Sequence, residues 1–277
     1  MSGAGGTPMT VSVTRLLLPA AARGGRRAPR VMERNFMAAR RSWFVFLSGF
    51  VEPVFYLLAI DIGLGQLVGE VTGPAGQPLP YTAFAAPALL AASAMNGAVY
   101  ESTFNIFFRL RYGKLYDAML STPLTPIDIA LGEIGWSQVR GLGYACAFMS
   151  VMGALGLIAS PWAVLAVPAA ILLGFAFGAA GLAAVTFMRS WVDLDMVNLA
   201  LLPLFLFSAT FYPLEVYPRP LQLLINLSPL YHGVELIRSL TLGVVHPGLL
   251  GHVAFLLAMA FVGAVIAARR LHRQLAP

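Results

Sequence analysis

Cysteine and charge are both scarce in this chain. Its 277 residues include one cysteine, and only 11% of them are charged, while 58% are hydrophobic. A soluble domain typically carries about 25% charged residues. Together with the mean hydropathy of +0.78, this composition excludes an ordinary soluble globular domain, and we predict an integral membrane protein.

The single cysteine, Cys146, excludes a disulfide within the chain. It lies inside a long apolar stretch, so we interpret it as a small packing residue. We do not expect His232 to bind a metal, because no cysteine or histidine stands at ligand spacing beside it in the sequence. The chain is therefore expected to hold no metal and no cofactor of its own.

Lysine is also represented once, and this excludes a nucleotide-binding P-loop. A P-loop needs a glycine-rich turn that ends in Gly-Lys followed by Ser or Thr. Lys114 follows Gly113 but precedes Leu115. The chain is therefore not expected to be an enzyme, and any ATP and Mg²⁺ would have to be bound by another polypeptide.

Long apolar stretches are abundant by contrast, and six of them are long enough to cross a bilayer as helices, which takes about 20 residues each. They are too long for strands and show no alternation of apolar and polar residues. We predict an all-α integral membrane protein whose six transmembrane helices lie at residues 43–65, 81–104, 129–158, 162–188, 194–211 and 249–268.

The basic residues predict the orientation of these spans. With an N-terminal tail inside the cell, all 18 lysines and arginines except Arg140, Arg219 and Arg238 fall in cytoplasmic tails and loops. We predict a multi-pass protein of the bacterial inner (plasma) membrane with both termini cytoplasmic. The net charge of +6 then serves orientation and contact with the anionic lipid bilayer rather than nucleic-acid binding.

Three segments follow from this layout. Residues 1–30 are expected to be a disordered basic tail, residues 31–271 the transmembrane domain, and residues 272–277 a short cytoplasmic tail. Just before the first span, Val31, Phe36 and Met37 alternate with arginines, as is typical of a helix that lies flat on the membrane surface. The alternative is a basic flank with an aromatic anchor at Trp43.

The loop between the second and third spans carries a short amphipathic pattern that ends at Pro123. Apolar and aromatic residues recur there at three- and four-residue spacing, with Lys114 and Asp117 among them. The apolar face comprises Tyr112, Leu115, Tyr116, Met119 and Leu120. The pattern fits equally a helix at the membrane surface and a docking element for a cytoplasmic partner.

Three stretches resemble the type-2 ABC exporter permeases, and most closely the nodulation lipo-oligosaccharide and daunorubicin exporter branches. The first is RYGKLYDAMLSTPL followed by Asp128, Gly132, Glu133 and Trp136. The second, VEPVFYLLAIDIGLG, resembles the family's first helix. The third, FLFSATFYPLEVYPRPLQLLINLSPLYHGVELIRSL, resembles its fifth span and external half-helices. The resemblance covers roughly residues 33–271.

This resemblance implies a function and its partners. The chain would be the permease of an ATP-driven exporter that moves an amphipathic or lipid-linked substrate, such as a lipo-oligosaccharide, a glycolipid or a hydrophobic drug. Its partners would be two copies of an ABC ATPase subunit and a second permease, most simply as a homodimer joined through the first and fifth spans. The residues expected to couple it to the ATPase are Tyr112, Lys114, Leu115, Tyr116, Asp117 and Met119.

Four charged residues fall within or beside the predicted spans: Glu52, Glu101, Glu133 and Arg140. Such residues usually face a bundle interior or a water-filled path. Glu133 and Arg140 are seven apart, so they share one helix face. Two interpretations remain open: Arg140 pairs with an interior carboxylate and fixes helix contacts, or the charges line the substrate's path.

The proline-rich segment 211–243 predicts re-entrant half-helices between the fifth and sixth spans. Phe211, Tyr212, Tyr231 and His232 would lie at the outer interface, where they form either an ordinary aromatic belt or, as the resemblance implies, an external gate. The alternative function is a proton-coupled carrier or an intramembrane enzyme. Neither a compact catalytic constellation nor inverted repeats are visible in the sequence.

Overall fold

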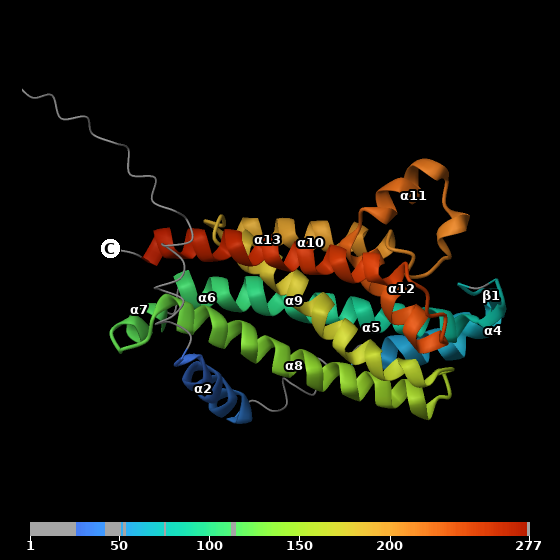
Figure 1. Cartoon of the computed structure of the whole chain (residues 1–277), viewed down its shortest axis with the longest axis horizontal. Coiled ribbons are helices and arrows are strands. Elements are labelled where there is room, and N and C mark those ends of the chain that lie inside the picture. Colours follow the sequence, from blue (N-terminus) through green and yellow to red (C-terminus); the bar gives the residue numbers. More distant parts are fainter. Residues whose placement is uncertain (1–25, 42–50, 52–53, 75, 112–114, 276–277) are drawn as a thin grey trace, which may run out of the picture.

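Long helices that run side by side dominate the computed structural model, which describes residues 26–41, 51, 54–74, 76–111 and 115–275 (Figure 1). The first half of the chain contains α2 (Ala28–Arg41), η1 (Ile60–Leu64), α4 (Gly65–Val68), β1 (Glu70–Thr72), β2 (Pro78–Pro80), α5 (Tyr81–Tyr100), η2 (Glu101–Asn105), α6 (Ile106–Arg111), α7 (Leu115–Leu120) and α8 (Pro126–Ala154). The second half contains η3 (Pro161–Leu165), α9 (Ala166–Val185), α10 (Trp191–Leu206), η4 (Leu214–Val216), α11 (Arg219–Asn226), α12 (Pro229–Leu242) and α13 (Leu249–Leu275).

Three stretches of helix in the described part of the chain are long and apolar enough to cross a membrane: Tyr81–Arg109, Pro161–Val185 and Leu249–Arg270. They coincide with the second, fourth and sixth predicted spans. The third predicted span coincides in position with α8, which has 29 residues. The fifth corresponds to α10, which has only 16 residues, and half of the first lies outside the described residues. The number of six spans therefore stays a prediction.

Helix α9 is the centre of the bundle and packs against α5, α8, α12 and α13. Its sequence is rich in alanine and glycine, which allows neighbouring backbones to approach closely. A Cβ atom added at Gly263 of α13 would lie 2.8 Å from the carbonyl carbon of Ala179 and from the nitrogen of Ala180. The contact between α9 and α13 therefore requires glycine at this position.

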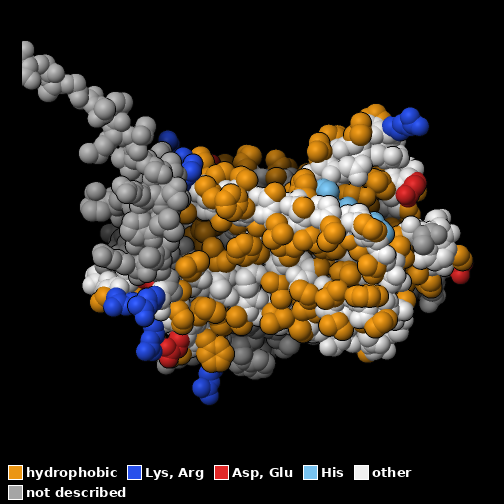
Figure 2. Space-filling view, in the orientation of Figure 1, with side chains coloured by type: hydrophobic (Ala, Val, Ile, Leu, Met, Phe, Trp, Pro, Cys, Tyr) orange, Lys and Arg blue, Asp and Glu red, His pale blue; other side chains and the backbone are white. Residues whose placement is uncertain are grey.

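The two ends of the bundle differ in structure. One end holds α7 and the end of α13, and the opposite end holds α4, α11 and β1 (Figure 1). There β1 and β2 form an antiparallel hairpin in which Val71 pairs with Leu79, a detail that the sequence did not predict. Hydrophobic side chains cover the middle of the face seen in Figure 2, and Lys and Arg gather mainly at the end that holds α7.

Helix α2 lies against α8 and does not stand apart as a separate surface helix. Val31 is buried, and a Cβ at Gly132 would collide with it. Phe36 keeps 59% of its surface exposed, although its ring packs edge-on against Trp136 at 6.2 Å between centroids. The apolar residues of α2 are thus divided between packing on α8 and exposure, and the location of α2 at a membrane surface stays a prediction.

Candidate functional site

Charged side chains from three helical segments meet inside the bundle near the end that holds α7. Glu101 begins η2, a wide π-type turn that joins α5 to α6, and such turns frequently occur at functional sites. Arg109 lies on α6, and Glu133 and Arg140 lie two turns apart on α8. We call these four residues the charged cluster.

Ion pairs link the charged cluster into a chain. Arg109 Nη1 forms an ion pair with Glu133 Oε2, and its Nη2 atom lies 3.6 Å from Glu101 Oε1. Arg140 Nη1 pairs with the other oxygen of Glu101. Two amides complete the arrangement: Asn35 of α2 donates to Glu133 Oε2 at 3.0 Å, and Asn105 donates to Glu101 Oε2 at 2.6 Å.

Burial makes the stability of the fold depend on both partners of these ion pairs. The side chains of Glu101 and Glu133 are only 5% and 4% exposed, whereas those of Arg109 and Arg140 are 25% and 21% exposed. Removing one partner of a buried pair typically costs about 3–5 kcal/mol, because the other charge is left uncompensated. The charged cluster therefore fixes the positions of η2, α6 and α8 relative to one another.

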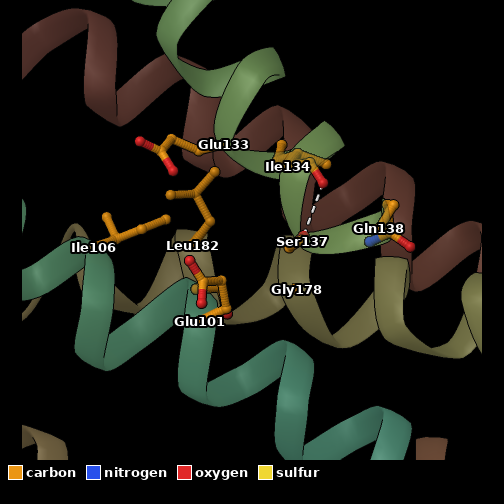
Figure 3. A pocket seen from close by; sticks show the side chains of 9 residues that line it. Glu101, Ile106, Glu133, Ile134, Ser137, Gln138, Gly178 and Leu182 are labelled. Atoms are coloured by element: carbon orange, nitrogen blue, oxygen red, sulfur yellow. Dashed lines mark hydrogen bonds between the residues drawn. The ribbon is translucent and has the colours of Figure 1, made fainter. Parts of the chain in front are cut away.

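A small pocket adjoins the charged cluster, and Figure 3 shows Glu101 and Glu133 on either side of Leu182 in it. Glu101 Oε1 and Glu133 Oε1 are buried and make no hydrogen bond with the described residues. The two serines that line the pocket donate to backbone carbonyls, Ser137 to Ile134 at 2.8 Å and Ser102 to Val99 at 3.3 Å. Neither serine is therefore paired with a base that would activate it as a nucleophile.

The predicted coupling residues are only partly described. Tyr112 and Lys114 lie outside the described residues, as does Glu52, and for Tyr116 and Asp117 the structure describes the backbone of α7 alone. The short α7 helix, Leu115–Leu120, corresponds to the second half of the predicted amphipathic segment.

Met119 was predicted to anchor the ATPase partner, and in the structure its side chain is turned inward instead. It is 7% exposed and belongs to a hydrophobic cluster with Val31 of α2 and Ile129 of α8, against which Leu115 also packs. The reason is geometric: α7 packs against α8, so Met119 and Leu115 are covered by neighbouring helices. Met119 therefore holds α7 to the body of the protein.

Asp128 connects the segment after α7 to the start of α2. Its Oδ2 atom accepts hydrogen bonds from the backbone N–H and the hydroxyl of Thr125, at 2.9 and 2.7 Å. Its Oδ1 atom accepts from the backbone N–H of Arg27 at 3.0 Å, and Arg27 Nη1 donates to the carbonyl of Pro123. The role of Asp128 at the start of α8 is recognisable from the sequence, because Thr125 and Asp128 form a capping box with Pro126 in the first turn.

The predicted outer-gate residues fall into two groups. Phe211 and Tyr212 lie between α10 and α11, where Phe211 packs edge-on against Phe205 at 5.2 Å and Tyr212 against Tyr217 at 6.4 Å. Burial raises the pKa of Tyr217, with the neighbouring Tyr212 adding to the effect. This group is therefore an aromatic contact at the end of the bundle that holds α4, α11 and β1 (Figure 1).

Tyr231 and His232 begin α12 and face α13 instead. His232 Nδ1 lies 2.7 Å from His252 Nδ1, and the rings of His232 and Phe255 stack at 4.0 Å. This histidine neighbour could not be recognised from the sequence, because His252 is 20 positions away from His232 along the chain. In the described residues no group of three or more His, Cys, Asp or Glu side chains could hold a metal ion.

Two features of the site were missed by reasoning from sequence. Asn35 and Arg109 were not predicted as partners of the buried carboxylates, since nothing in the spacing of distant segments reveals their contact. Arg238 was assigned to an external connection, yet the structure buries it in α12 with 2% of its surface exposed. By contrast, Glu101, Glu133 and Arg140 were expected near the bundle interior, and the structure brings all three together.

Helices of this length and apolarity, with charges paired inside the bundle, define an integral membrane protein. Residues 30–242, which are more than half of the chain, match the family described as ABC-2 type transporter. The chain belongs to this family and is a membrane permease component of ABC transport.

Curated relatives agree with this assignment. Nodulation protein J of Sinorhizobium fredii is 32% identical over 248 residues, which cover 88% of this chain and 92% of that protein. Nodulation protein J of Rhizobium leguminosarum bv. viciae is 29% identical over 260 residues, which cover 91% of this chain and 96% of that protein. The similarity therefore extends over nearly the whole of both proteins.

Proposed function

We propose that the chain is the membrane subunit of an ATP-driven exporter that moves an amphipathic or lipid-linked substrate outward. The first candidate substrate is a lipo-oligosaccharide, because the curated relatives are nodulation proteins and the motifs resemble the nodulation lipo-oligosaccharide exporters. A glycolipid and a hydrophobic drug are the other candidates. Two copies of a separate ABC ATPase subunit would bind ATP and Mg²⁺ and would drive two copies of this permease.

The observation that carries the proposal is the position of the charged cluster. Arg109 lies on α6, directly before the segment that leads into α7, and it is paired with Glu133 on α8, directly after that segment. A movement imposed on α7 by a partner would therefore be passed to both adjoining helices at once. Such an arrangement suits a coupling helix that transmits movement from the ATPase.

Asp128 gives this coupling region a second attachment. It ties the capping box of α8 to the backbone of Arg27 at the start of α2. Because Met119 and Val31 of α2 also belong to one hydrophobic cluster, α2, α7 and the start of α8 would move together. We propose that Tyr116 and Asp117 of α7 contact the ATPase, while Met119 and Leu115 hold α7 to the permease.

The proposed membrane arrangement has six spans, both termini in the cytoplasm and a homodimer joined through the first and fifth spans. Support for the dimer contact comes from α10, in which Leu194 is the one buried residue. Five of its exposed apolar residues recur at three- and four-residue spacing: Val192, Met196, Leu199, Leu202 and Leu206. A second permease would cover this stripe.

A proton-coupled carrier is the second candidate function, and one observation favours it. Each buried carboxylate of the charged cluster has one oxygen that makes no hydrogen bond with the described residues, and both residues line the pocket. Against a proton relay, both carboxylates are held in ion pairs with guanidinium groups. A carrier would transport its substrate with a proton gradient and without an ATPase.

Reconstitution tests the proposal. The permease would be purified with its ABC ATPase partner, placed in lipid vesicles, and supplied with a lipo-oligosaccharide. Mass spectrometry would identify the lipids that co-purify. The proposal expects transport only with hydrolysable ATP. Transport by the permease alone, driven by a pH gradient, would establish the carrier instead.

A further inference from the structure

The outer end of the molecule contains a fully buried arginine that touches three separate segments. Arg238 lies on α12, and 2% of its surface is exposed. Its Nε atom donates to the carbonyl of Phe84 on α5 at 3.1 Å, and its Nη2 atom donates to the carbonyl of Ala209 at 2.7 Å. One side chain therefore joins α5, α12 and the turn that follows α10.

The contact with α5 involves both the ring and the backbone of Phe84. The guanidinium carbon of Arg238 lies 3.8 Å from the centroid of the Phe84 ring, a geometry in which the ring attracts the cation. Pro87 interrupts the backbone hydrogen-bond ladder in the same part of α5. Glu235, one turn earlier on α12, lies 3.6 Å from Arg238 Nη1 and balances its charge.

The other contact holds a strained turn. Among the residues that the structure describes, Ala209 is the one non-glycine residue with a positive φ, at 53°. This backbone region is unfavourable for any residue with a Cβ atom and persists only where the surroundings enforce it. The carbonyl that accepts the hydrogen bond from Arg238 belongs to this same residue.

A second polar contact secures the turn to α12. The hydroxyls of Ser208 and Ser228 lie 2.6 Å apart, and Ser228 caps the N-terminus of α12. Within α10 itself only Leu194 is buried. Other apolar residues of α10 pack half-buried against the hydrophobic core: Val197, Leu201, Leu204 and Phe205. The turn that follows α10 is also held to α12 by directional hydrogen bonds, and hydrogen bonds can be broken and re-formed without dismantling a hydrophobic core.

We propose that Arg238 is a positioning residue that holds the turn between α10 and α11 in a strained, closed arrangement, by joining it to α5 and α12. When these hydrogen bonds break, Ala209 relaxes to a negative φ, and α10 and α11 become free to move away from α5. The inference deepens the proposed function, on which it rests, because outward export requires the outer end to open.

Two substitutions are expected to act in opposite directions. Arg238→Met removes both carbonyl contacts and favours the open arrangement. Ala209→Gly removes the penalty of a positive φ in the closed arrangement and lowers the ratio of open to closed molecules by about fivefold. Arg238→Lys keeps the charge but lacks the planar fork that reaches two carbonyls, so it should fall between wild type and Arg238→Met.

The measurement is a distance distribution between spin labels on Leu67→Cys of α4 and Leu223→Cys of α11, in a Cys146→Ala background. Both leucines are strongly exposed, at 85% and 70%, and Cys146 is exposed and would otherwise be labelled. Full-length permease in lipid nanodiscs is measured without the ATPase and without substrate. Arg219→Met, which changes an exposed arginine on α11, is the matched control.

The wild type and Arg219→Met should give one narrow distance, whereas Arg238→Met should add a second, longer population. Ala209→Gly introduced into the Arg238→Met protein should reduce that population about fivefold. If Arg238→Met fails to fold, the same distances are measured in Arg238→Lys with and without Ala209→Gly, and that comparison decides instead.

A purely structural arginine predicts a different pattern. Thermal stability would fall, but the folded molecules would keep the wild-type distance, and Ala209→Gly would have no opposing effect. An unchanged distance in Arg238→Met, or the absence of an opposing effect of Ala209→Gly, would overturn the proposal. Because the distances are recorded without ATPase or substrate, failure of the wild-type complex to transport with ATP would count against the proposed function and leave this comparison intact.

Discussion

Arg109 and Glu133 are 24 positions apart in the chain, and their side chains form an ion pair between α6 and α8. The segment between them contains α7, the helix that we propose contacts the ATPase. The pair therefore closes a loop at its base, and the remaining contacts of Arg109 and Glu133 extend the connection to η2 and α2.

Arg109→Met should destabilise the permease by about 3–5 kcal/mol, because it leaves the buried carboxylate of Glu133 without its guanidinium partner. The double variant Arg109→Met, Glu133→Gln should recover part of this loss, since it removes both charges of the pair. Thermal unfolding of the purified permease measures both effects. The matched control is Arg30→Met, which breaks an exposed ion pair with Glu33 and should cost no more than about 1 kcal/mol. Equal unfolding temperatures for Arg109→Met and Arg30→Met would contradict this account of the charged cluster.

Asp128→Ala should weaken coupling more than it weakens the fold. The loss of a helix cap typically costs about 1 kcal/mol, but this substitution also detaches the start of α2 from α8. We therefore expect the permease to remain folded while ATP-driven transport falls severalfold. The measurement is the ratio of transport to ATP hydrolysis in vesicles, and an unchanged ratio would argue against the role of Asp128.

Asp193→Ala is the control for Asp128→Ala, because Asp193 completes the capping box of α10. Backbone N–H groups of Arg189 and Ser190 hold the pKa of Asp193 below its usual value. A depressed carboxyl pKa stabilises the fold above the ordinary value of about 3.9, and this contribution disappears as the pH falls through the lower folded value. Asp193→Ala should therefore lower the unfolding temperature at neutral pH, lose that effect in strong acid, and leave coupling unchanged.

Composition and hydropathy were sufficient to predict the helical architecture, because apolar runs of bilayer length can satisfy their backbone only as helices. The contacts between the helices that those runs form could not be predicted from the sequence. Glu133 and Arg140 share a face of α8 as their spacing requires, yet Arg140 pairs with Glu101 while Glu133 pairs with Arg109. Those choices depend on the π-type turn η2 and on helix positions that the sequence does not encode locally.

Two further differences have the same cause. Met119 belongs to an amphipathic pattern, and the pattern alone does not reveal whether its apolar face meets a partner or the protein's own core. Arg238 lies in a proline-rich segment for which the sequence predicted re-entrant half-helices but not which side chains are buried. Its burial follows from contacts with α5 and with the turn after α10. The capping box at Thr125 and Asp128 is local, and it could have been recognised from the sequence.

Gly263→Ala should disrupt the packing of α13 on α9, since the added Cβ would lie 2.8 Å from backbone atoms of Ala179 and Ala180. Backbone atoms cannot move aside as a flexible side chain can, so we expect a loss of about 1–3 kcal/mol. Gly251→Ala on the same helix is the control. No atom lies within 4 Å of its added Cβ, and it should be neutral or stabilising by up to about 1 kcal/mol. Thermal unfolding of both variants provides the comparison, and equal effects would contradict the close approach of the two helices.

The topology can be mapped with single cysteines in a Cys146→Ala background. We expect Lys114→Cys to be protected from a membrane-impermeant reagent in intact cells, because the basic residues gather on the cytoplasmic side. Gly76→Cys and Pro220→Cys should be labelled under the same conditions. Labelling at position 114 in intact cells would reject the proposed orientation.

The most direct test of the account is the ATPase activity of the reconstituted complex, measured with and without lipo-oligosaccharide. Tyr116→Ala, Asp117→Ala on α7 should leave the permease folded and inserted, because an aromatic anchor at an interface typically contributes about 2 kcal/mol or more to partner binding without supporting the bundle. The complex should then lose substrate-stimulated hydrolysis and transport, whereas Arg30→Ala, Glu33→Ala on α2, an exposed pair, should retain both. Full stimulation in the α7 double variant would contradict the claim that this helix couples the permease to its ATPase.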